Sequence, residues 1–433
     1  MNKFIFFLAW IIIVFIYLNF QNHNMLFYKK KYIESASLSK IAWKRFLKNK
    51  LSFSALLLVI VFIICSILAY IITPDSTPFA NEQFLELATK KPGFSINMLK
   101  IKKNEQNENV GLVSKMLFGE KNKYTSIPVY KYRFVDEFIE IEVYTGLTPN
   151  DGELKKINLA DVLYSLNVDY PINRRADYID FKDINGCLHH KSIVYLQKTI
   201  SEQSFYKKTY LLGSDRFGRD MLSLLIIGTR VSLSVGFISV FISLIIGILL
   251  GSLAGFFRGW VDNIIVWFIN VVWSIPTLLL VIAITFALGK GFWQVFIAVG
   301  LTMWVEVARV VRGQILSIRE KEFVEAGRAM GFKNSRLIFN HILPNIMGAV
   351  IVISAANFAS AILMEAGLSF LGIGVQPPMP SWGSMIKENY AYIILDSAYL
   401  AILPGIAIMI MVLSFMIIGN GLRDALDVKI VEK

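Results

Sequence analysis

The hydrophobic positions of this 433-residue chain gather in seven long runs, separated by polar and mostly basic segments. A helix needs roughly 20 apolar residues to cross a hydrocarbon core of about 30 Å, because lipid offers no partner for an unpaired backbone group. Six runs meet or approach that length. They lie at 51–72, 231–257, 263–289, 291–308, 342–364 and 397–422. The pattern predicts an all-α polytopic membrane protein with a core of six transmembrane helices.

The seventh run, residues 4–22, lies at the N-terminus. No small-x-small cleavage site follows it, so residues 1–27 are predicted to form an extra, uncleaved transmembrane helix rather than a signal peptide. Residues 28–50 carry eight lysines and arginines. Basic residues beside membrane spans stay on the cytoplasmic side, which predicts that 28–50 is a cytoplasmic segment.

The same rule orients the rest of the chain. With 28–50 inside and 51–72 as the first core helix, the loop 309–345 is also inside, and it holds seven lysines and arginines. The short loop on the opposite side has only Lys290. The C-terminus, which carries Arg423, is therefore predicted to be cytoplasmic.

The segment 73–210 separates the first core run from the other five, which lie within 211–433. Its 138 residues are too many for a structureless loop, and the alternation of isoleucine and glutamate at 139–142 is typical of a strand. We expect a small folded external insert domain, either a landing surface for a binding protein or a shield over an outer gate.

Composition agrees with a membrane protein and argues against a nucleic-acid-binding one. The chain is 55% hydrophobic and 18% charged, with a net charge of +12. Lysine and arginine number 19 in 73–210 against 18 acidic residues, which leaves 25 against 14 elsewhere. The surplus thus flanks the apolar runs, and no basic tract is interleaved with aromatic residues that would stack on bases.

Motifs of known enzyme chemistry are absent from the sequence. There is no G-x-x-x-x-G-K-S/T loop for ATP, no G-x-S-x-G elbow and no H-E-x-x-H helix. His189 and His190 are adjacent but lack cysteines or carboxylates at ligand spacing, so surface residues are favoured over a metal site. We expect a chain with no catalytic residues, no metal and no cofactor of its own.

The most informative segment is the predicted cytoplasmic stretch 322–331, which reads EFVEAGRAMG and is followed by Leu343 and Pro344. It predicts a short helix, a break at Gly331 and a second helix with proline in the first turn of the next span. Its simplest interpretation is an amphipathic surface helix. The segment also resembles the E-A-A motif of ABC importer permeases, E-A-A-x-x-x-G with L-P twelve positions later. Gly327 stands where that family usually has its second alanine.

Two further segments resemble permeases of the dipeptide, oligopeptide and nickel class of ABC importers. The stretch 212–223 is similar to L-G-T-D-x-x-G-R-D-x-L-S, and we expect Ser214 or Asp215 to cap a short helix along the outer membrane face, with Leu222 and Leu225 toward lipid. The stretch 369–383 is similar to S-F-L-G-x-G followed by P-x-P-S-W-G, whose glycines and prolines turn the chain back at that surface. The ending 421–427 resembles the C-type partner of this class.

The resemblance implies a type I ABC importer permease fold and one half of a pathway for peptides, or for nickel or a peptide-like compound. It implies a heterodimer with a second permease, two ATP-binding subunits that hold ATP and Mg, an external substrate-binding protein and a place in the bacterial inner membrane. The implied ATPase-coupling helix and its flank contain Phe323, Glu325, Ala326, Gly327, Gly331, Leu343 and Pro344. The implied outer-face and gate motifs contain Asp215, Gly218, Arg219, Asp220, Trp382 and Gly383.

Candidate pathway residues lie on the run 342–364 and just beyond it. Ser354, Asn357 and Ser360 are three positions apart, so they are predicted to line one face of a cavity or to pack helices together. Glu365 ends an uncharged stretch, where a carboxylate facing lipid is costly. It is predicted either to face the pathway or to extend to the outer surface, and the second is favoured.

Two other classes of protein compete with the importer. A secondary transporter that needs no ATPase predicts paired charges within spans and an inverted repeat, whereas Glu306 lies near a cytoplasmic end with Arg309 at i,i+3 as its expected partner. A membrane-anchored receptor needs only one anchor. Neither class explains the three motifs.

Overall fold

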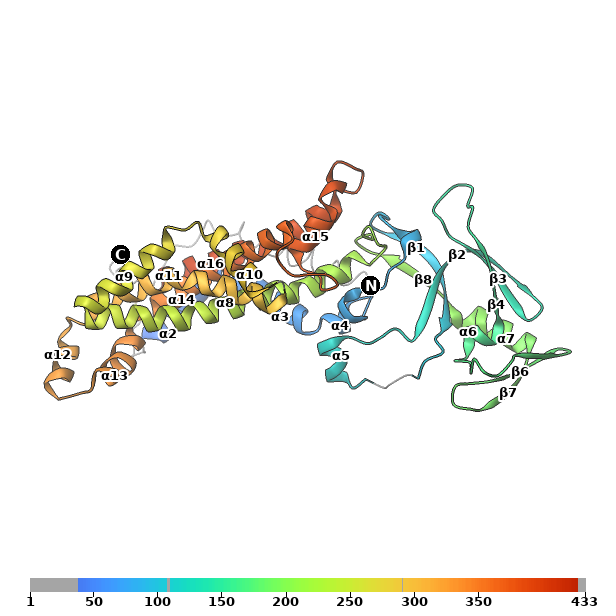
Figure 1. The fold of residues 1–433 in the computed structure, drawn as a ribbon, viewed down its shortest axis with the longest axis horizontal. Coiled ribbons are helices and arrows are strands. Elements are labelled where there is room, and N and C mark those ends of the chain that lie inside the picture. Colours follow the sequence, from blue (N-terminus) through green and yellow to red (C-terminus); the bar gives the residue numbers. More distant parts are fainter. Residues whose placement is uncertain (1–37, 107–109, 290, 427–433) are drawn as a thin grey trace, which may run out of the picture.

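The computed structural model describes residues 38–106, 110–289 and 291–426, and the molecule is elongated (Figure 1). A bundle of long helices forms one part, and a unit that holds the described strands lies beyond one end of the bundle (Figure 1). The extra transmembrane helix predicted within 1–27 falls outside the described residues.

Five helical runs are long and apolar enough to cross a membrane, judged by length and composition. They are α3 (Lys50–Ile67), α8 (Met221–Phe257), α11 (Phe292–Ile318), the run Asn334–Leu371 and α16 (Tyr399–Leu426). The remaining predicted core run, 263–289, forms two helices, α9 (Gly259–Trp273) and α10 (Thr277–Leu288), which meet at 92°. Pro276 explains the break, because proline lacks a donor N–H and disfavours helix in the residue before it.

The run Asn334–Leu371 contains three segments, α13 (Asn334–Arg336), the π-helical η4 (Leu337–Ile342) and α14 (Leu343–Leu371). Pro344 lies in the first turn of α14, as the sequence predicts. Its missing N–H deprives the preceding turn of a donor, and a π-turn directly upstream is one way for the helix to accommodate that loss.

Helix α8 begins earlier than the apolar run indicates. It starts at Met221, and the Oδ2 of Asp220 accepts a hydrogen bond from the backbone N–H of Ser223, 2.8 Å away. The prediction of a separate short helix capped by Ser214 or Asp215 is therefore wrong. Residues 214–220 form turns before α8, and Leu222 and Leu225, in its first turns, pack against the core of the bundle rather than toward lipid.

Glycines allow α8 and α11 to approach each other closely. Gly247, Gly251 and Gly255 recur every four residues, so they lie on one face of α8. A Cβ added to Gly251 would lie 2.6 Å from the backbone oxygen of Ala308 on α11, closer than real Cβ contacts. This small-residue face lets the two helices pack backbone to backbone, which is how helices associate where lipid removes the hydrophobic driving force.

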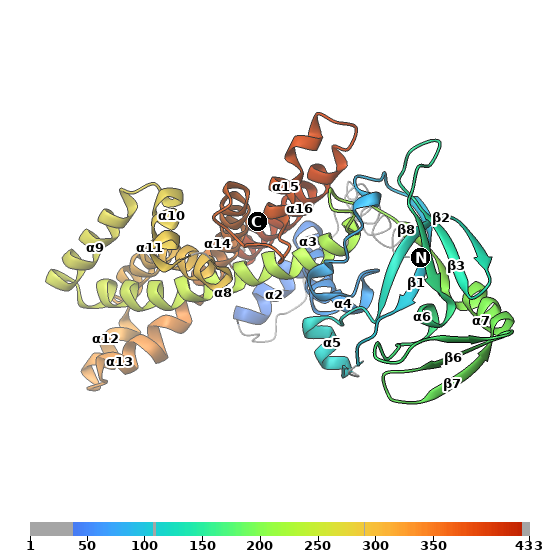
Figure 2. The same cartoon turned by 45° about the vertical axis from the view of Figure 1, so that its right-hand side comes forward.

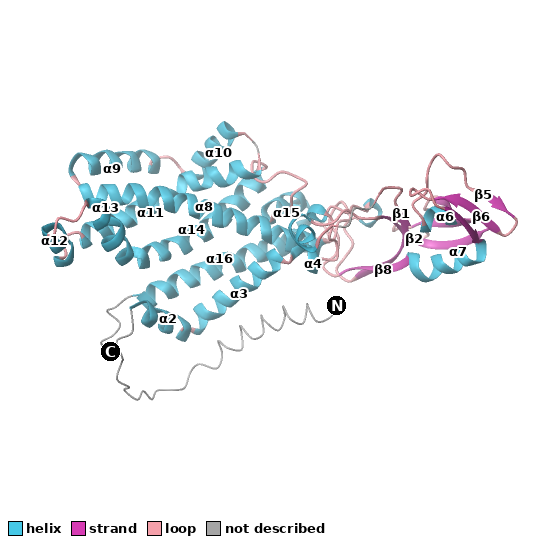
Figure 3. Cartoon of the chain, turned by 90° about the horizontal axis from the view of Figure 1, so that it is seen from below, coloured by secondary structure: helices cyan, strands magenta, loops and turns pink. Residues whose placement is uncertain are grey.

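The short helix α2 (Leu38–Lys48) packs beside the last turns of α16 (Figure 3). Phe46 is buried there, and its ring lies 3.3 Å from where a Cβ on Gly421 would stand. Figure 3 shows α2 toward the same end of the bundle as α12 (Glu322–Ala329), and away from the strands. Helices α2 and α12, which belong to two of the basic segments of the chain, thus lie toward the same end of the molecule.

The insert contains two antiparallel sheets. One has the order β4 (Leu154–Asn158), β3 (Phe138–Val143), β2 (Tyr124–Val135), β1 (Phe94–Lys102), β8 (Phe205–Tyr210). The other has the order β5 (Asn173–Arg175), β6 (Tyr178–Lys182), β7 (Leu188–Ser192). The strand predicted from isoleucine and glutamate at 139–142 is β3, at the second position of the larger sheet.

Each face of the larger sheet buries its own core. Leu99 points to one side and packs with α6 (Leu159–Leu163), α7 (Ile193–Thr199) and the π-helical η3 (Ile200–Ser204). Met98 points to the other side, toward the segment that holds η1 (Pro78–Ala80) and η2 (Leu85–Leu87). That second face is the one turned toward the helical bundle (Figure 2).

Candidate functional site

The predicted coupling segment folds as α12, at the end of the bundle farthest from the insert (Figure 1). Val324 and Gly327 are its buried residues. Phe323, Glu325 and Ala326 are exposed, and no partner of the Glu325 carboxylate is present in the described part of the chain. The helix therefore presents a mixed apolar and acidic face outward while its other face holds it to the bundle.

Two glycines fix the shape of this segment. Gly327 faces Leu337, and a Cβ there would lie 2.7 Å from the Leu337 Cδ2 atom, which explains glycine where the related motif has alanine. Gly331 has φ +74°, the left-handed region that glycine adopts at little cost. The N–H of Gly331 donates to the carbonyl of Arg328, 2.9 Å away, and the chain then turns sharply toward α13. The predicted glycine break is confirmed at this position.

The first outer motif forms a buried junction rather than a surface loop. Asp215 is fully buried, and its Oδ1 accepts hydrogen bonds from the backbone N–H groups of Phe217 (2.9 Å) and Arg219 (2.8 Å). The Nε of Arg219 donates to Asp215 Oδ2 at 2.6 Å, and its Nη2 donates to Glu388 at 2.7 Å. Glu388 belongs to α15 (Trp382–Asn389), so Arg219 links the segment before α8 to the helix that begins in the third motif.

Gly218 and Ser214 join this junction to the insert. Gly218 has φ +71°, and a Cβ on it would overlap the backbone oxygen of Phe84 at 1.8 Å, so only glycine fits. The Ser214 hydroxyl donates to the carbonyl of Leu87 and accepts from the backbone N–H of Lys90 at 2.8 Å. The motif 212–223 thus ties the segment before β1 to the first turn of α8.

The third motif turns back over the helix ends, as predicted. Gly372 ends α14 with φ +80°, and α15 then lies against α8 and α14. Trp382 is fully buried, and its indole N–H donates to the carbonyl of Leu225 at 3.1 Å. A Cβ on Gly383 would lie 2.6 Å from Ala366 Cα, so the small residue permits the close approach to α14.

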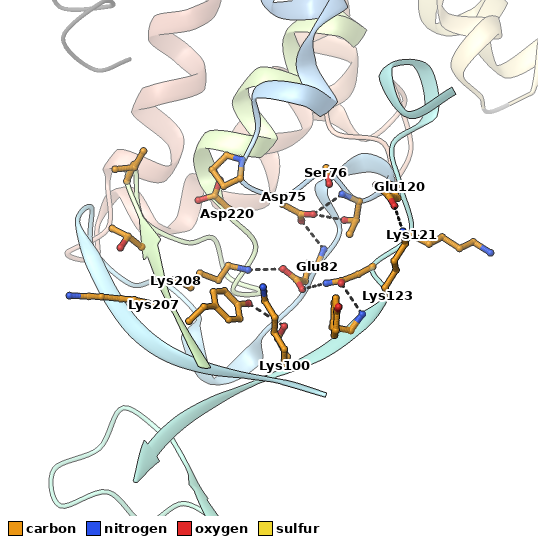
Figure 4. Close-up of a pocket in the computed structure, with 18 residues that line it drawn as sticks. Asp75, Ser76, Glu82, Lys100, Glu120, Lys121, Lys123, Lys207, Lys208 and Asp220 are labelled. Carbon is orange, nitrogen blue, oxygen red and sulfur yellow. Dashed lines mark hydrogen bonds and ion pairs between the residues drawn. The ribbon is translucent and has the colours of Figure 1, made fainter. Parts of the chain in front are cut away.

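A charged pocket of about 420 Å³ lies where the insert meets the bundle (Figure 4). Glu82 points to its centre, where it accepts hydrogen bonds from Lys208 at 2.7 Å and from Asn122 at 2.6 Å. The Lys100 ammonium lies 4.4 Å from the centre of the Tyr206 ring, and burial raises the pKa of that tyrosine to about 12. These contacts join separate segments of the insert to one another beside the end of the bundle.

Comparison with known proteins assigns the chain to a family. Residues 247–432 match the model for the inner membrane component of binding-protein-dependent transport systems, and residues 37–92 match the N-terminal transmembrane domain of oligopeptide transport permease C. The dipeptide transport system permease protein DppC of Alkalihalophilus pseudofirmus is 42% identical over 217 residues, which cover 50% of this chain and 71% of that protein. The chain belongs to the permease family of ABC importers.

The chain is also similar to a second transport permease and to a solved structure. The glutathione transport system permease protein GsiD of Pectobacterium atrosepticum is 40% identical to this permease over 219 residues, 51% of this chain and 72% of that protein. A solved structure of the MetNI methionine ABC transporter covers 47% of the permease and 97% of its own chain, at 20% identity and a TM-score of 0.41, which is too low to support an argument. Neither family model covers 93–246, which includes the strands of the insert.

Glu365 is not at the surface of the permease. It is fully buried on α14, and its carboxylate accepts hydrogen bonds from Ser369 (2.7 Å) and Ser232 (3.4 Å). The favoured prediction, that it extends to the outer surface, is wrong, because the chain turns back at Gly372 and α15 covers this site. It does not face an open pathway within the described chain either.

The three polar residues of α14 differ in burial. Asn357 is buried, Ser354 is half-buried and Ser360 is exposed. A spacing of three residues shifts each member by about 60° around the axis, so the three side chains spread over about 120°. Their place in a pathway stays a prediction. The side-chain oxygen and nitrogen of Asn357 have no hydrogen-bond partner in the described chain. Ser354 donates to the carbonyl of Val350 instead, at 2.6 Å.

The pairing expected for Glu306 is also wrong. The Arg309 guanidinium lies 3.3 Å from the centre of the Trp273 ring and donates to Asn270 on α9. Arg312 forms the ion pair that fixes α9 to α11, with Asp262 at 2.6 Å. In the insert, His189 and His190 pair separately with Asp183 and Asp180, so the two rings do not converge.

Replacing Glu365 with leucine is expected to lower the free energy of unfolding by about 1 to 3 kcal/mol, because Ser369 and Ser232 lose their acceptor in a buried site. Glu365→Gln keeps one side-chain oxygen as acceptor and should cost clearly less. The midpoint of thermal unfolding of the purified permease in detergent measures both. Equal midpoints for the two variants would contradict this role.

Sequence reasoning missed two features of the permease. The glycine spacing of Gly247, Gly251 and Gly255 is readable as a small-residue face, and it was the available signal for the α8–α11 contact. The bridge from Arg219 to Glu388 joins residues 169 positions apart, and no local pattern announces it.

Proposed function

We propose that this permease forms one half of the translocation pathway of an importer for peptides. A second, B-type permease would complete the pathway as a heterodimer, two ATP-binding subunits would bind ATP and Mg, and an external binding protein would deliver the substrate. The observation that carries the proposal is the exposed face of α12, held at the end of the molecule opposite the insert.

The geometry of α12 suits contact with an ATPase. Phe323 and Met330 are large apolar side chains left 45% and 66% exposed, and they flank the acidic Glu325. Exposed apolar groups beside a polar rim are typical of a surface that a protein partner covers. Val324 and Gly327 anchor the opposite face, so a push on α12 would be passed to Leu337 and on to α14.

Charge supports the placement of α12 in the cytoplasm. Basic residues gather on α2 and along 309–336, at the end of the bundle away from the insert, as the positive-inside rule requires of a cytoplasmic face. We therefore place the chain in the bacterial inner membrane with its C-terminus inside and the insert outside. The permease would contribute no ATPase site of its own.

Peptides are proposed as cargo because the two relatives transport a dipeptide and glutathione, according to their names. Both substrates are short and peptide-like. We assign the selection among such compounds to the external binding protein.

The test is purification of the tagged permease in mild detergent from its native membrane, with mass spectrometry of the proteins that accompany it. We expect a second permease and two ATP-binding subunits with the wild type, and several-fold less of the ATP-binding subunits with Glu325→Ala/Gly331→Ala. The matched control is Glu153→Ala/Gly186→Ala, which changes an exposed glutamate and a glycine of φ +85° on the insert.

The control should retain all partners. If the wild type purifies alone from membranes that contain the ATP-binding subunits, the importer assignment fails in favour of a secondary transporter or a receptor. If α12 and insert variants lose the partners equally, α12 is not the contact. A monodisperse gel-filtration peak for each variant shows that loss of partners is not loss of folding.

A further inference from the structure

Helix α5 (Leu112–Phe118) of the insert presents apolar side chains with nothing packed on them in the described chain. Leu112 is 75% exposed, Val113 67% and Phe118 69%, and Leu117 is also exposed. No residue of this seven-residue helix is buried. A folded domain rarely leaves four large apolar side chains together in water, so a partner for this helix is expected.

Contacts with the bundle fix the position of α5. It packs against α4 (Ala69–Ile72), the short continuation of α3 (Figure 1). The Arg230 guanidinium of α8 donates to the carbonyl of Leu117 at 2.9 Å and lies over the Tyr70 ring. A Cβ on Gly119 would lie 2.8 Å from the backbone oxygen of Ser76, so the chain after α5 is pressed against the end of the bundle.

Arg230 marks the level of the membrane surface. It is the last charged residue before the apolar run 231–257, so its guanidinium belongs at the boundary between headgroups and hydrocarbon. Because α5 is hydrogen-bonded to it, α5 lies at the same level. A helix at that depth meets lipid with any side that the protein does not cover.

The apolar surface of α5 continues a row on α3 and α4. Exposed hydrophobic side chains recur at three and four residue intervals there, which places them on one face. The row consists of Phe53, Leu57, Ile60, Ile64, Ile67 and Ile71. Ile71 is on α4, against which α5 packs, so the row ends on the helix that α5 contacts.

Basic residues flank α5 on its polar side. Lys115 and Lys123 share one carboxylate, that of Glu120, at 2.7 and 3.0 Å. Lys121 is exposed and has no ion pair in the described chain. Three lysines against one glutamate leave a local charge of about +2, which favours anionic phospholipid headgroups.

We propose that α5 is an interfacial membrane anchor of the insert. Its apolar side chains enter the acyl boundary of the leaflet on the insert's side, and Lys121 and Lys123 meet the phosphates of anionic phospholipids. The insert is then held at the bilayer by lipid as well as by its two chain connections. This inference depends on the transmembrane helices alone and not on the identity of the ATP-binding partners.

The test places a bimane fluorophore at Val113→Cys in the full-length chain, with Cys65→Ala and Cys187→Ala, reconstituted in nanodiscs that contain brominated phosphatidylcholine. The matched control is Val194→Cys on α7, a valine of similar exposure (72%) on the far part of the insert. We expect most of the fluorescence at 113 to be quenched by the brominated acyl chains and the fluorescence at 194 to be unchanged.

Equal fluorescence at 113 and 194 would overturn the proposal. Protection of 113 from both bromolipid and aqueous iodide would also overturn it, because a protein would then cover α5. Appearance of quenching only after deletion of 1–27 would identify that segment as the occupant instead. Replacing brominated phosphatidylcholine by brominated phosphatidylglycerol should deepen the quenching, and the double variant Lys121→Gln/Lys123→Gln should remove that difference. No difference between the two lipids would exclude the role of the lysines.

Discussion

Replacing Arg219 with alanine is expected to lower the free energy of unfolding of the permease by about 3 to 5 kcal/mol, because two carboxylates lose their shared counter-charge. The Asp215 side chain is fully buried and that of Glu388 is only 15% exposed, so water cannot replace the guanidinium. The midpoint of thermal unfolding in detergent reports the loss. Proteolysis of the segment 73–92 should rise in parallel, since the same junction holds it.

Arg216→Ala is the control for this prediction. It removes the same charge three positions earlier from an exposed side chain that stacks on Phe217. Exposed charges contribute about 0 to 1 kcal/mol, so its midpoint should stay close to that of the wild type. The unfolding midpoint of Arg219→Lys should lie between those of the wild type and Arg219→Ala, because one ammonium cannot donate to two carboxylates with the planar geometry of the guanidinium. Equal effects of Arg219→Ala and Arg216→Ala would show that the buried bridge does not stabilise the fold.

The second expected result concerns the contact between α8 and α11. Gly251→Val is expected to destabilise the permease by about 1 to 3 kcal/mol or more, because its first added carbon would lie 2.6 Å from a backbone oxygen that cannot move without α11. The yield of monodisperse protein and the midpoint of thermal unfolding measure the effect. Gly251→Ala adds the same first carbon, so it should already show part of this destabilisation.

Gly405→Val provides the comparison within α16. A Cβ on Gly405 meets nothing within 4 Å, so any effect there reflects helix propensity and not collision. If Gly251→Val and Gly405→Val unfold at the same temperature, the glycine face is not a packing device. Substitutions at Gly247 and Gly255, which meet Val307 and Ile315 on the same helix, should behave like those at Gly251.

Much of this fold follows from patterns that are local in sequence. Apolar runs identify helices because lipid leaves no other way to satisfy the backbone. The break at Gly331 and the turn at Gly372 were predictable because glycine adopts, at little cost, the positive φ that ends a helix. The three motifs likewise identified the family, since each is short and contiguous.

What the sequence did not reveal depends on contacts between distant segments. The burial of Glu365 requires α15 to fold back over α14, and the early start of α8 requires the insert to supply partners for its first turn, such as the bond from the backbone N–H of Asp75 to Ser223. The bend at Pro276 was readable as a helix break but not as an angle of 92°. Hydropathy shows whether a run of residues is apolar enough for a membrane, whereas these features arise from contacts with segments that are distant in sequence.

The unbroken length of α8 has a mechanical consequence. Its 37 residues form a rod of about 55 Å that starts beside the insert at Met221 and ends beside the last turn of α11, where Arg319 donates to the carbonyl of Phe256. A rod of that length converts a tilt of about 5° into a displacement of roughly 5 Å at its far end. Small rotations on one side of the bilayer therefore become ångström-scale strokes on the other.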